Sequence, residues 1–204
     1  MMNEAEHSVA FSERALKQRE RILDAARLCF VKHGLHGASI AHIAQEAGMS
    51  PGLMYRYFEN KNAIIKAIVQ RQLDSGRKSL EEITSPDHFV QGILSAMDRW
   101  RSSDADQMSA PLFLEISAEA TRDPEIAAIV AEADTLLRNH LRDAMQRTAA
   151  SKAIFQDERR AKARMLLLLS LVEGLAVRSC REPELDRESL RSALTKFLAG
   201  VQSE

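Results

Sequence analysis

One short stretch of this sequence, residues 39–61, limits what the chain can fold into more than any other part. It reads SIAHIAQEAGMSPGLMYRYFENK. Its first half has apolar residues at the i, i+3, i+4 and i+7 spacing of one buried helix face. These residues are Ile40, Ile43, Ala44 and Ala47. The spacing predicts a short helix, with Ser39 as its N-cap.

The residues that follow predict a tight turn and a second short helix. Gly48 tolerates the left-handed conformation that ends many helices. Ser50 is a favourable N-cap, and Pro51 suits the first helical position because the N–H that it lacks would have no partner there. A helix, a short turn containing glycine and a second helix form a helix-turn-helix, which typically places its second helix in the major groove of DNA.

The second predicted helix carries side chains that suit this contact. Arg56 can donate two parallel hydrogen bonds to a guanine edge or hold a phosphate. The hydroxyls of Tyr55 and Tyr57 can donate to phosphate oxygens, and Lys61 adds a flexible charge. The alternative is that the aromatic residues close the core of a small helical domain. This alternative suits Phe58 and partly suits Tyr55, but one helix cannot bury four adjacent residues.

The segment resembles the DNA-binding domain of the TetR family of bacterial transcription regulators. The resemblance begins with RILDAARLCFVKHGLHGAS and continues through IAHIAQEAGMSPG and YRYFENK, which together make up about the first third of the chain. It implies DNA contacts by Ser39, Ser50, Pro51, Gly52, Leu53, Tyr55, Arg56, Tyr57 and Lys61. Where the family usually has a small or polar residue followed by Leu, this chain has Leu53 and Met54. We expect Leu53 to touch a thymine methyl or a sugar. Because it differs from the usual residue at a position that often meets DNA, the resemblance does not predict the operator sequence.

The composition of the chain is that of an all-α protein. Its 204 residues are 45% hydrophobic and 28% charged, with 8 Gly and 5 Pro, and no alternating strand pattern persists. The net charge of −1 hides a gradient, because residues 1–80 hold 12 Lys and Arg against 8 Asp and Glu. Positive charge on one module is typical of nucleic-acid binding, although ordinary variation along a chain gives similar asymmetry.

The rest of the chain is expected to be helical, with about nine helices in all. We expect a helix-turn-helix DNA-binding domain at 13–62 and a ligand-binding and dimerisation domain at 63–204. Residues 1–12 are polar and unpatterned, so a flexible arm is expected there. Lys17, Arg19 and Arg21 are expected to reach phosphates that flank the groove. Within the helix-turn-helix, the second helix is expected at 51–58. The other expected helices are 13–33, one that begins at 60–61, 86–101, 107–121, 123–148, 157–180 and 184–202.

The last two predicted helices carry enough apolar surface to suggest a partner. The run 165–172 is apolar apart from Ser170, and a helix that is apolar on most of its circumference must be covered on more than one side. The TetR resemblance implies a homodimer held by a four-helix bundle. Its two recognition helices would lie roughly 34–36 Å apart and read a palindrome in double-stranded DNA. The expected interface residues are Leu171, Gly174, Leu175, Arg178, Leu190, Leu194, Phe197, Leu198 and Val201.

The resemblance also implies a small-molecule effector in the C-terminal domain, of unknown identity. Methionine and aromatic residues suit an adaptable apolar pocket, although apolar residues at helical spacing are more often core. Glu173 lies in the most apolar helix and is the charge most in need of a partner. The candidate ligand-binding residues are Met97, Trp100, Met108, Leu112, Phe113, Ile116, Leu137, His140, Met165 and Glu173.

Other classes of function find little support in the sequence. The six histidines form no HExxH motif and no Cys/His metal spacing, and there is no phosphate-binding glycine loop or nucleophile elbow. We therefore expect no enzyme activity, metal or cofactor. The two cysteines form no CxxC pair, and no signal peptide or membrane span is expected, which suits the cytoplasm.

The sequence thus predicts a cytoplasmic, homodimeric, ligand-responsive transcriptional repressor that leaves its operator when an effector binds. Two alternatives stay open. One is a regulator or DNA-organising protein that responds to no small molecule. The other is a dimeric small-molecule-binding protein or enzyme that has lost DNA binding.

Overall fold

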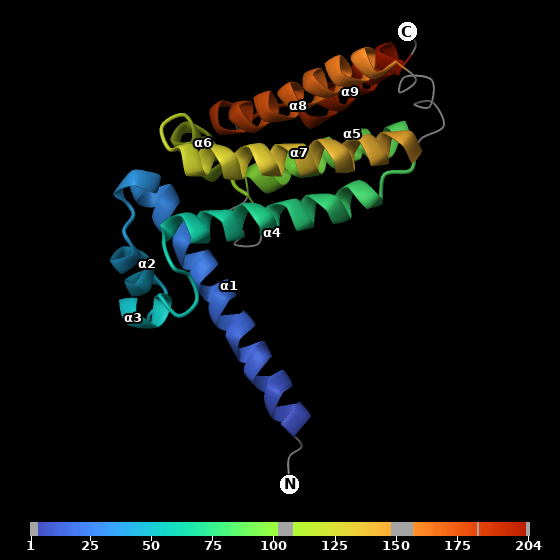
Figure 1. Ribbon diagram of the computed structural model, residues 1–204. Coiled ribbons are helices and arrows are strands. Elements are labelled where there is room, and N and C mark those ends of the chain that lie inside the picture. Colours follow the sequence, from blue (N-terminus) through green and yellow to red (C-terminus); the bar gives the residue numbers. More distant parts are fainter. Residues whose placement is uncertain (1–3, 102–107, 148–156, 183, 203–204) are drawn as a thin grey trace. The chain divides into compact units, whose positions relative to one another are not determined.

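The computed structural model describes residues 4–101, 108–147, 157–182 and 184–202. Within these ranges the regular structure is nine α-helices, so the all-α prediction is confirmed (Figure 1). The helices are α1 (Glu4–Gly37), α2 (Ile40–Glu46), α3 (Pro51–Met54), α4 (Lys61–Glu81), α5 (Pro86–Arg101), α6 (Ala110–Ala120), α7 (Pro124–Arg147), α8 (Glu158–Arg181) and α9 (Arg187–Gln202).

The helices form two compact units. The first unit comprises Met1–Val69 and Glu115–Ile129, and the second comprises Gln70–Leu114 and Val130–Glu204. Helices α4, α6 and α7 each contribute residues to both units. The predicted division at residues 62 and 63 is a division by function, and it stays a prediction.

The first helix differs from its prediction at one end and agrees at the other. It begins at Glu4, so the expected flexible arm is wrong for residues 4–12. Nothing in that segment breaks a helix, because it contains neither proline nor glycine. At the other end Gly34 has φ 71° and ψ 161°, a conformation almost restricted to glycine, and it interrupts the helix where a stop was predicted.

The helix-turn-helix lies in the first unit and is built from the local contacts that its sequence predicts. The Ser39 hydroxyl accepts from the N–H of His42 at 3.1 Å and caps α2. Gly48 turns the chain with φ 61°. The Ser50 hydroxyl accepts from the N–H of Leu53 at 3.2 Å and caps α3.

Helix α3 is shorter than the predicted helix 51–58. After it ends at Met54, the N–H of Tyr57 donates to the carbonyl of Met54 at 2.8 Å, an i to i−3 bond. Such bonds tighten the last turn of a helix and end it. The aromatic residues that follow Met54 are also weaker helix formers than the Ala, Leu and Arg residues that are frequent in α1.

The core of the second unit is formed by α5, α7, α8 and α9. Helix α5 packs against both α8 and α9 (Figure 1). The apolar run predicted at 165–172 supplies one wall of this core. The buried members of the core are Ile83, Phe89, Val90, Ile93, Leu94, Leu141, Ala144, Met145, Met165, Leu168, Leu169, Leu194 and Leu198.

Capping residues explain where several later helices begin. Helix α5 spans Pro86–Arg101, as predicted. The carboxylate of Asp186 accepts from the N–H groups of Glu188 and Ser189, so α9 begins at Arg187 and not at residue 184. Helix α6 begins at Ala110; its predicted first residue, 107, lies outside the described residues. Across the described part of the chain, every helix is too short or too polar to cross a membrane.

Replacing Gly34 by alanine is expected to lower the free energy of unfolding by about 1–3 kcal/mol, because the conformation at this position strains any residue with a side chain. The new Cβ would also lie 3.2 Å from Oε2 of Glu115. Urea unfolding followed by circular dichroism measures the change. The control is Gly76→Ala in α4, where a Cβ meets nothing within 4 Å. The Gly76→Ala control is expected to raise the free energy of unfolding by about 0.4–1 kcal/mol. A Gly34→Ala variant as stable as the unmodified chain would contradict the prediction.

Candidate nucleic-acid interface

Helix α3 and the hydrogen-bonded turns that continue it to Phe58 bury one side and leave the other open to solvent; we call the exposed side the open side of α3. Met54 and Phe58 are buried, whereas Pro51 is exposed and the Tyr55 side chain is 56% exposed. Arg56 is exposed too. The open side therefore combines an aromatic hydroxyl with a guanidinium, two groups that bind phosphates and base edges.

Gly52 lies on the same open side. A Cβ built on Gly52 would meet nothing within 4 Å. Its lack of a side chain is thus not required by packing within the chain. It leaves room for another backbone, such as a sugar-phosphate strand, to approach α3 closely.

The other residues predicted to contact DNA are placed in two ways. Ser39 and Ser50 are exposed, and although each caps a helix as an acceptor, each hydroxyl keeps its own O–H for donation. Leu53, Tyr57 and Lys61 are half-buried. The DNA-contact role of all nine residues stays a prediction.

Two arginines of α1 bind main-chain carbonyls of the helix-turn-helix region. Arg19 Nη1 donates to the carbonyl of Tyr57 at 2.8 Å, and its guanidinium lies over the Phe58 ring, 4.3 Å from the centroid. Arg21 Nη2 lies 3.4 Å from the carbonyl oxygen of Gly48, to which it donates. Arg19 and Arg21 were predicted to contact phosphates, and their internal bonds were not predicted, because a contact such as the one that spans 38 residues leaves no local pattern in the sequence.

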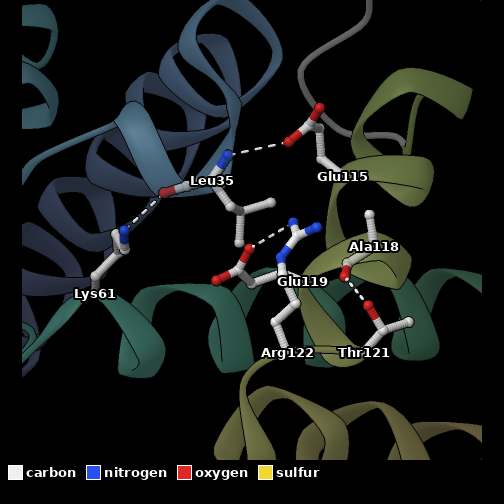
Figure 2. A network of polar contacts seen from close by, with 7 residues as sticks. All are labelled: Leu35, Lys61, Glu115, Ala118, Glu119, Thr121 and Arg122. Atoms are coloured by element: carbon white, nitrogen blue, oxygen red, sulfur yellow. Dashed lines mark hydrogen bonds and ion pairs between the residues drawn. The ribbon is translucent and has the colours of Figure 1, made fainter.

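A second set of contacts surrounds Leu35, just before the helix-turn-helix (Figure 2). Lys61 Nζ donates to the carbonyl of Leu35 at 2.6 Å. The N–H of Leu35 donates to Oε2 of Glu115, on α6, at 3.1 Å. One turn further along α6, Glu119 accepts from Arg122 at 3.0 Å. Lys61 was predicted to contact DNA, and neither of the two bonds to Leu35 was predicted from the sequence.

The first turns of α4 and α7 meet through polar groups in the same unit. Asn62 Nδ2 donates to Oε2 of Glu125 at 2.7 Å. Asp123 caps α7, accepting from the N–H groups of Glu125 and Ile126. The bond from Ile126, followed by that from Glu125, holds the pKa of Asp123 below its ordinary value, so this cap is a carboxylate at neutral pH.

The histidines and cysteines of the described residues form no built metal site. The rings of His33 and His42 lie 5.5 Å apart between centroids. No group of three or more His, Cys, Asp or Glu side chains within the described ranges is arranged to hold a metal ion. Cys29 is buried, and burial raises the pKa of its thiol, which suits a packing residue.

The candidate ligand-binding residues are spread over both units. Ile116 belongs to the first unit and the other candidates to the second. Met97, Leu112, Ile116 and Met165 are buried; Trp100, Met108, Phe113, Leu137 and His140 are half-buried; and Glu173 is exposed. Their ligand-binding role stays a prediction.

Two polar groups of this set lie in surroundings that are unfavourable for them: one lacks a hydrogen-bond partner, and the other is disfavoured in its charged form. The Nδ1 atom of His140 is buried and has no hydrogen-bond partner among the described residues. Although Glu173 as a whole residue is exposed, partial burial of its carboxyl group, and then the nearby charge of Asp134, raises its pKa. Both groups would gain from a further polar partner.

The residues expected at the dimer interface divide between the core and the surface. Leu194 and Leu198 are buried within the unit itself, and Leu171, Leu175 and Leu190 are half-buried against its core. Gly174, Arg178 and Phe197 are exposed, and the side chain of Val201 lies outside the described ones. The assignment of an interface to these residues stays a prediction.

Two exposed leucines of α8 are not among the residues predicted for the interface. The side chains of Leu166 and Leu167 are 62% and 59% exposed, although they lie in the most apolar stretch of the chain. The apolar run in the sequence could have indicated them. When only one side of a helix that is apolar all round is buried, apolar residues on its other side stay exposed to solvent.

Lys61→Ala is expected to lower the free energy of unfolding by about 1.5–3 kcal/mol, since it removes a charged donor from the Leu35 carbonyl. Urea unfolding measures this, with Lys78→Ala, an exposed position of the same helix, as the control. The salt dependence of DNA binding tests the separate phosphate role, whose loss reduces the slope by about one unit. A Lys61→Ala variant as stable as the Lys78→Ala variant would show that the bond to Leu35 contributes nothing.

Glu173→Gln is expected to stabilise the fold at neutral pH. The raised pKa means that the folded state holds a proton on Glu173 more readily than the unfolded state, so this group costs stability as pH rises through the raised pKa. The gain from glutamine should vanish below the ordinary pKa of glutamate. Glu158→Gln is the control with the opposite sign, because the hydrogen bond from Lys162 lowers the pKa of Glu158. Thermal unfolding across a pH series distinguishes the two, and equal pH profiles would contradict the prediction.

Comparison with known proteins gives a consistent assignment. The family model "Bacterial regulatory proteins, tetR family" matches residues 22–68, and the model "BetI-type transcriptional repressor, C-terminal" matches residues 94–203. The HTH-type transcriptional regulator UidR of Escherichia coli K12 is 30% identical over 188 residues, which cover 90% of this chain and 92% of UidR. The HTH-type transcriptional repressor AcnR of Corynebacterium efficiens is 29% identical over 145 residues, covering 70% of this chain and 71% of AcnR.

A solved structure agrees with these relatives. Salmonella enterica GusR is 28% identical and superimposes with a TM-score of 0.77, covering 93% of this chain and 97% of GusR. The C-terminal family model alone spans more than half of the chain, and the N-terminal one spans the helix-turn-helix. The chain therefore belongs to the TetR family of bacterial regulatory proteins and is a DNA-binding transcriptional regulator.

Proposed function

We propose that this regulator is a homodimeric repressor that binds a palindromic operator and releases it when a small-molecule effector binds the C-terminal domain. The observation that carries the proposal is the open side of α3. It presents Tyr55 and Arg56 to solvent beside the unoccupied space at Gly52. Arg19 and Arg21 bind the carbonyls of Tyr57 and Gly48, which ties α1 to the chain on both sides of α3 and supports a helix-turn-helix held in place for a major groove.

The dimer is supported by apolar surface on the last two helices. Leu166 and Leu167 on α8 and Phe197 on α9 are large apolar side chains left open to water. Covering them with a second copy removes apolar surface from water on both partners, which favours association. A two-fold dimer also matches the symmetry of a palindrome and sets the half-sites about one helical turn apart.

The repressor and effector assignments are supported by the C-terminal match. Residues 94–203 match the C-terminal part of BetI-type transcriptional repressors, and AcnR is itself named a repressor. The unpaired Nδ1 of His140 supports an effector with a polar group, because such a group would satisfy it. An effector that favours one dimer geometry by ~1–3 kcal/mol lowers operator affinity ~5–150-fold.

Selection from a pool of randomised duplexes tests the proposal. Purified protein is mixed with the pool at fixed salt, and the retained DNA is sequenced. Recovery of a palindrome with half-sites about one helical turn apart supports the dimeric reading mode. Salt-sensitive binding without sequence preference would contradict operator recognition, and a single asymmetric half-site would contradict the dimer.

Arg56→Ala is expected to weaken operator binding by about 1–3 kcal/mol and to relax specificity at one base position, because it removes the guanidinium on the open side of α3. Fluorescence anisotropy with the selected duplex and single-base variants measures both effects. Arg77→Ala is the matched control, since Arg77 is an exposed arginine of α4 that pairs with Glu81. If Arg56→Ala instead weakens all duplexes alike and reduces the salt slope, Arg56 holds a phosphate and not a base.

A further inference from the structure

Leu35 lies where the last regular turn of α1 has ended and the helix-turn-helix is about to begin. The unusual conformation of Gly34 takes the N–H of Leu35 out of the helical hydrogen-bond ladder. That N–H donates to Oε2 of Glu115 at 3.1 Å, and the Leu35 carbonyl accepts from Lys61 at 2.6 Å (Figure 2). Both main-chain polar groups of a residue that is 1% exposed are therefore held by charged side chains.

The Glu115 carboxylate lies close to Gly34, in space that a side chain at Gly34 would approach. A Cβ added to Gly34 would lie 3.2 Å from Oε2 of Glu115. The carboxylate thus occupies the space next to the glycine as well as the hydrogen-bonding direction of Leu35. At 3.1 Å the bond has the ordinary length of an N–H···O hydrogen bond, and it gives the Leu35 N–H a partner outside its own helix.

The peptide held in this way leads directly into α2. The N–H of Ala38 donates to the carbonyl of Gly34 at 3.1 Å, and the next residue, Ser39, is the N-cap of α2. A shift at Leu35 is therefore passed to the start of the helix-turn-helix within one turn of chain. Glu115 itself is on α6, whose residues 110–114 belong to the second unit.

We propose that Glu115 is a positioning residue for DNA recognition, which fixes the entry to the helix-turn-helix through Leu35 and so makes operator affinity depend on α6. The proposal rests on the proposed operator binding, and it adds the regulation of that same site. Glu115 touches no DNA in this mechanism. It acts by holding Leu35, and through Leu35 the orientation of α2 and α3.

Electrostatic repulsion alone predicts the opposite change in DNA affinity when Glu115 is replaced by a neutral residue. Removing any carboxylate from a DNA-binding unit reduces its repulsion of phosphates and strengthens DNA binding without regard to sequence. A positioning role predicts weaker binding to the operator alone. The two explanations can therefore be distinguished by the direction of the change.

The test compares three variants on the selected operator and on a scrambled duplex, at fixed salt and at a temperature where circular dichroism shows each variant folded. Glu115→Ala removes the acceptor. Glu115→Gln keeps a side-chain oxygen that can accept from Leu35. Glu119→Ala is the matched control, because it removes one carboxylate from the same helix and breaks only the ion pair with Arg122.

The expected result is a loss of about five- to tenfold in operator affinity for Glu115→Ala, at the low end of typical couplings between sites. Glu115→Gln should recover most of the loss, and Glu119→Ala should bind the operator at least as tightly as the unmodified chain. All three should bind the scrambled duplex no more weakly than the unmodified chain. Amide hydrogen exchange at Leu35 should be faster in Glu115→Ala than in Glu119→Ala.

Three outcomes would overturn the proposal: full operator affinity in Glu115→Ala, an equal loss in Glu119→Ala, or no recovery in Glu115→Gln. If Glu115→Ala does not fold, Glu115→Asp replaces it with the same expected direction, since its carboxylate ends one methylene short of Leu35. An unmodified chain that prefers no duplex would refute the proposed operator binding and this inference with it. A protected Leu35 amide beside full affinity in Glu115→Ala would refute this inference alone.

Discussion

The break in α1 at Gly34 is the constraint on which the DNA-binding unit depends. A helix that continued through this point would keep the N–H of Leu35 in its own ladder and would carry the chain away from α2. With φ 71° the chain turns, and a buried donor and a buried acceptor are left to be satisfied from outside the helix. Buried polar groups without partners are costly, so Glu115 and Lys61 become requirements of the turn.

How far the sequence predicts the structure depends on the range of the interactions. The caps at Ser39 and Ser50, the turn at Gly48 and the stop at Gly34 are local, and each was predicted from the residue and its neighbours. The predicted start of α1 is wrong, because a polar segment without a periodic pattern can still be helical when, like residues 4–12, it contains no helix breaker.

The candidate site was less predictable because its supports are long-range. The open side of α3 follows from helix periodicity, since Met54 and Phe58 must face the core. The bond from Arg19 to Tyr57 and the bond from Leu35 to Glu115 span 38 and 80 residues. Single-sequence patterns carry no information on such pairs. The same limit applies to Leu194 and Leu198, because a single sequence does not reveal that they pack in the core of their own unit.

The turn at Gly48 has an evolutionary consequence. A Cβ at Gly48 would lie 2.6 Å from Nη2 of Arg21, so these two positions share one volume although they are 27 residues apart in sequence. Among homologous chains, a side chain at this turn is strained by the positive φ whatever its neighbours are, and its Cβ would in addition displace the Arg21 guanidinium, the far end of a flexible side chain. Glycine is therefore expected at this turn whatever residue stands at the position of Arg21, and independently of which operator each homologue recognises.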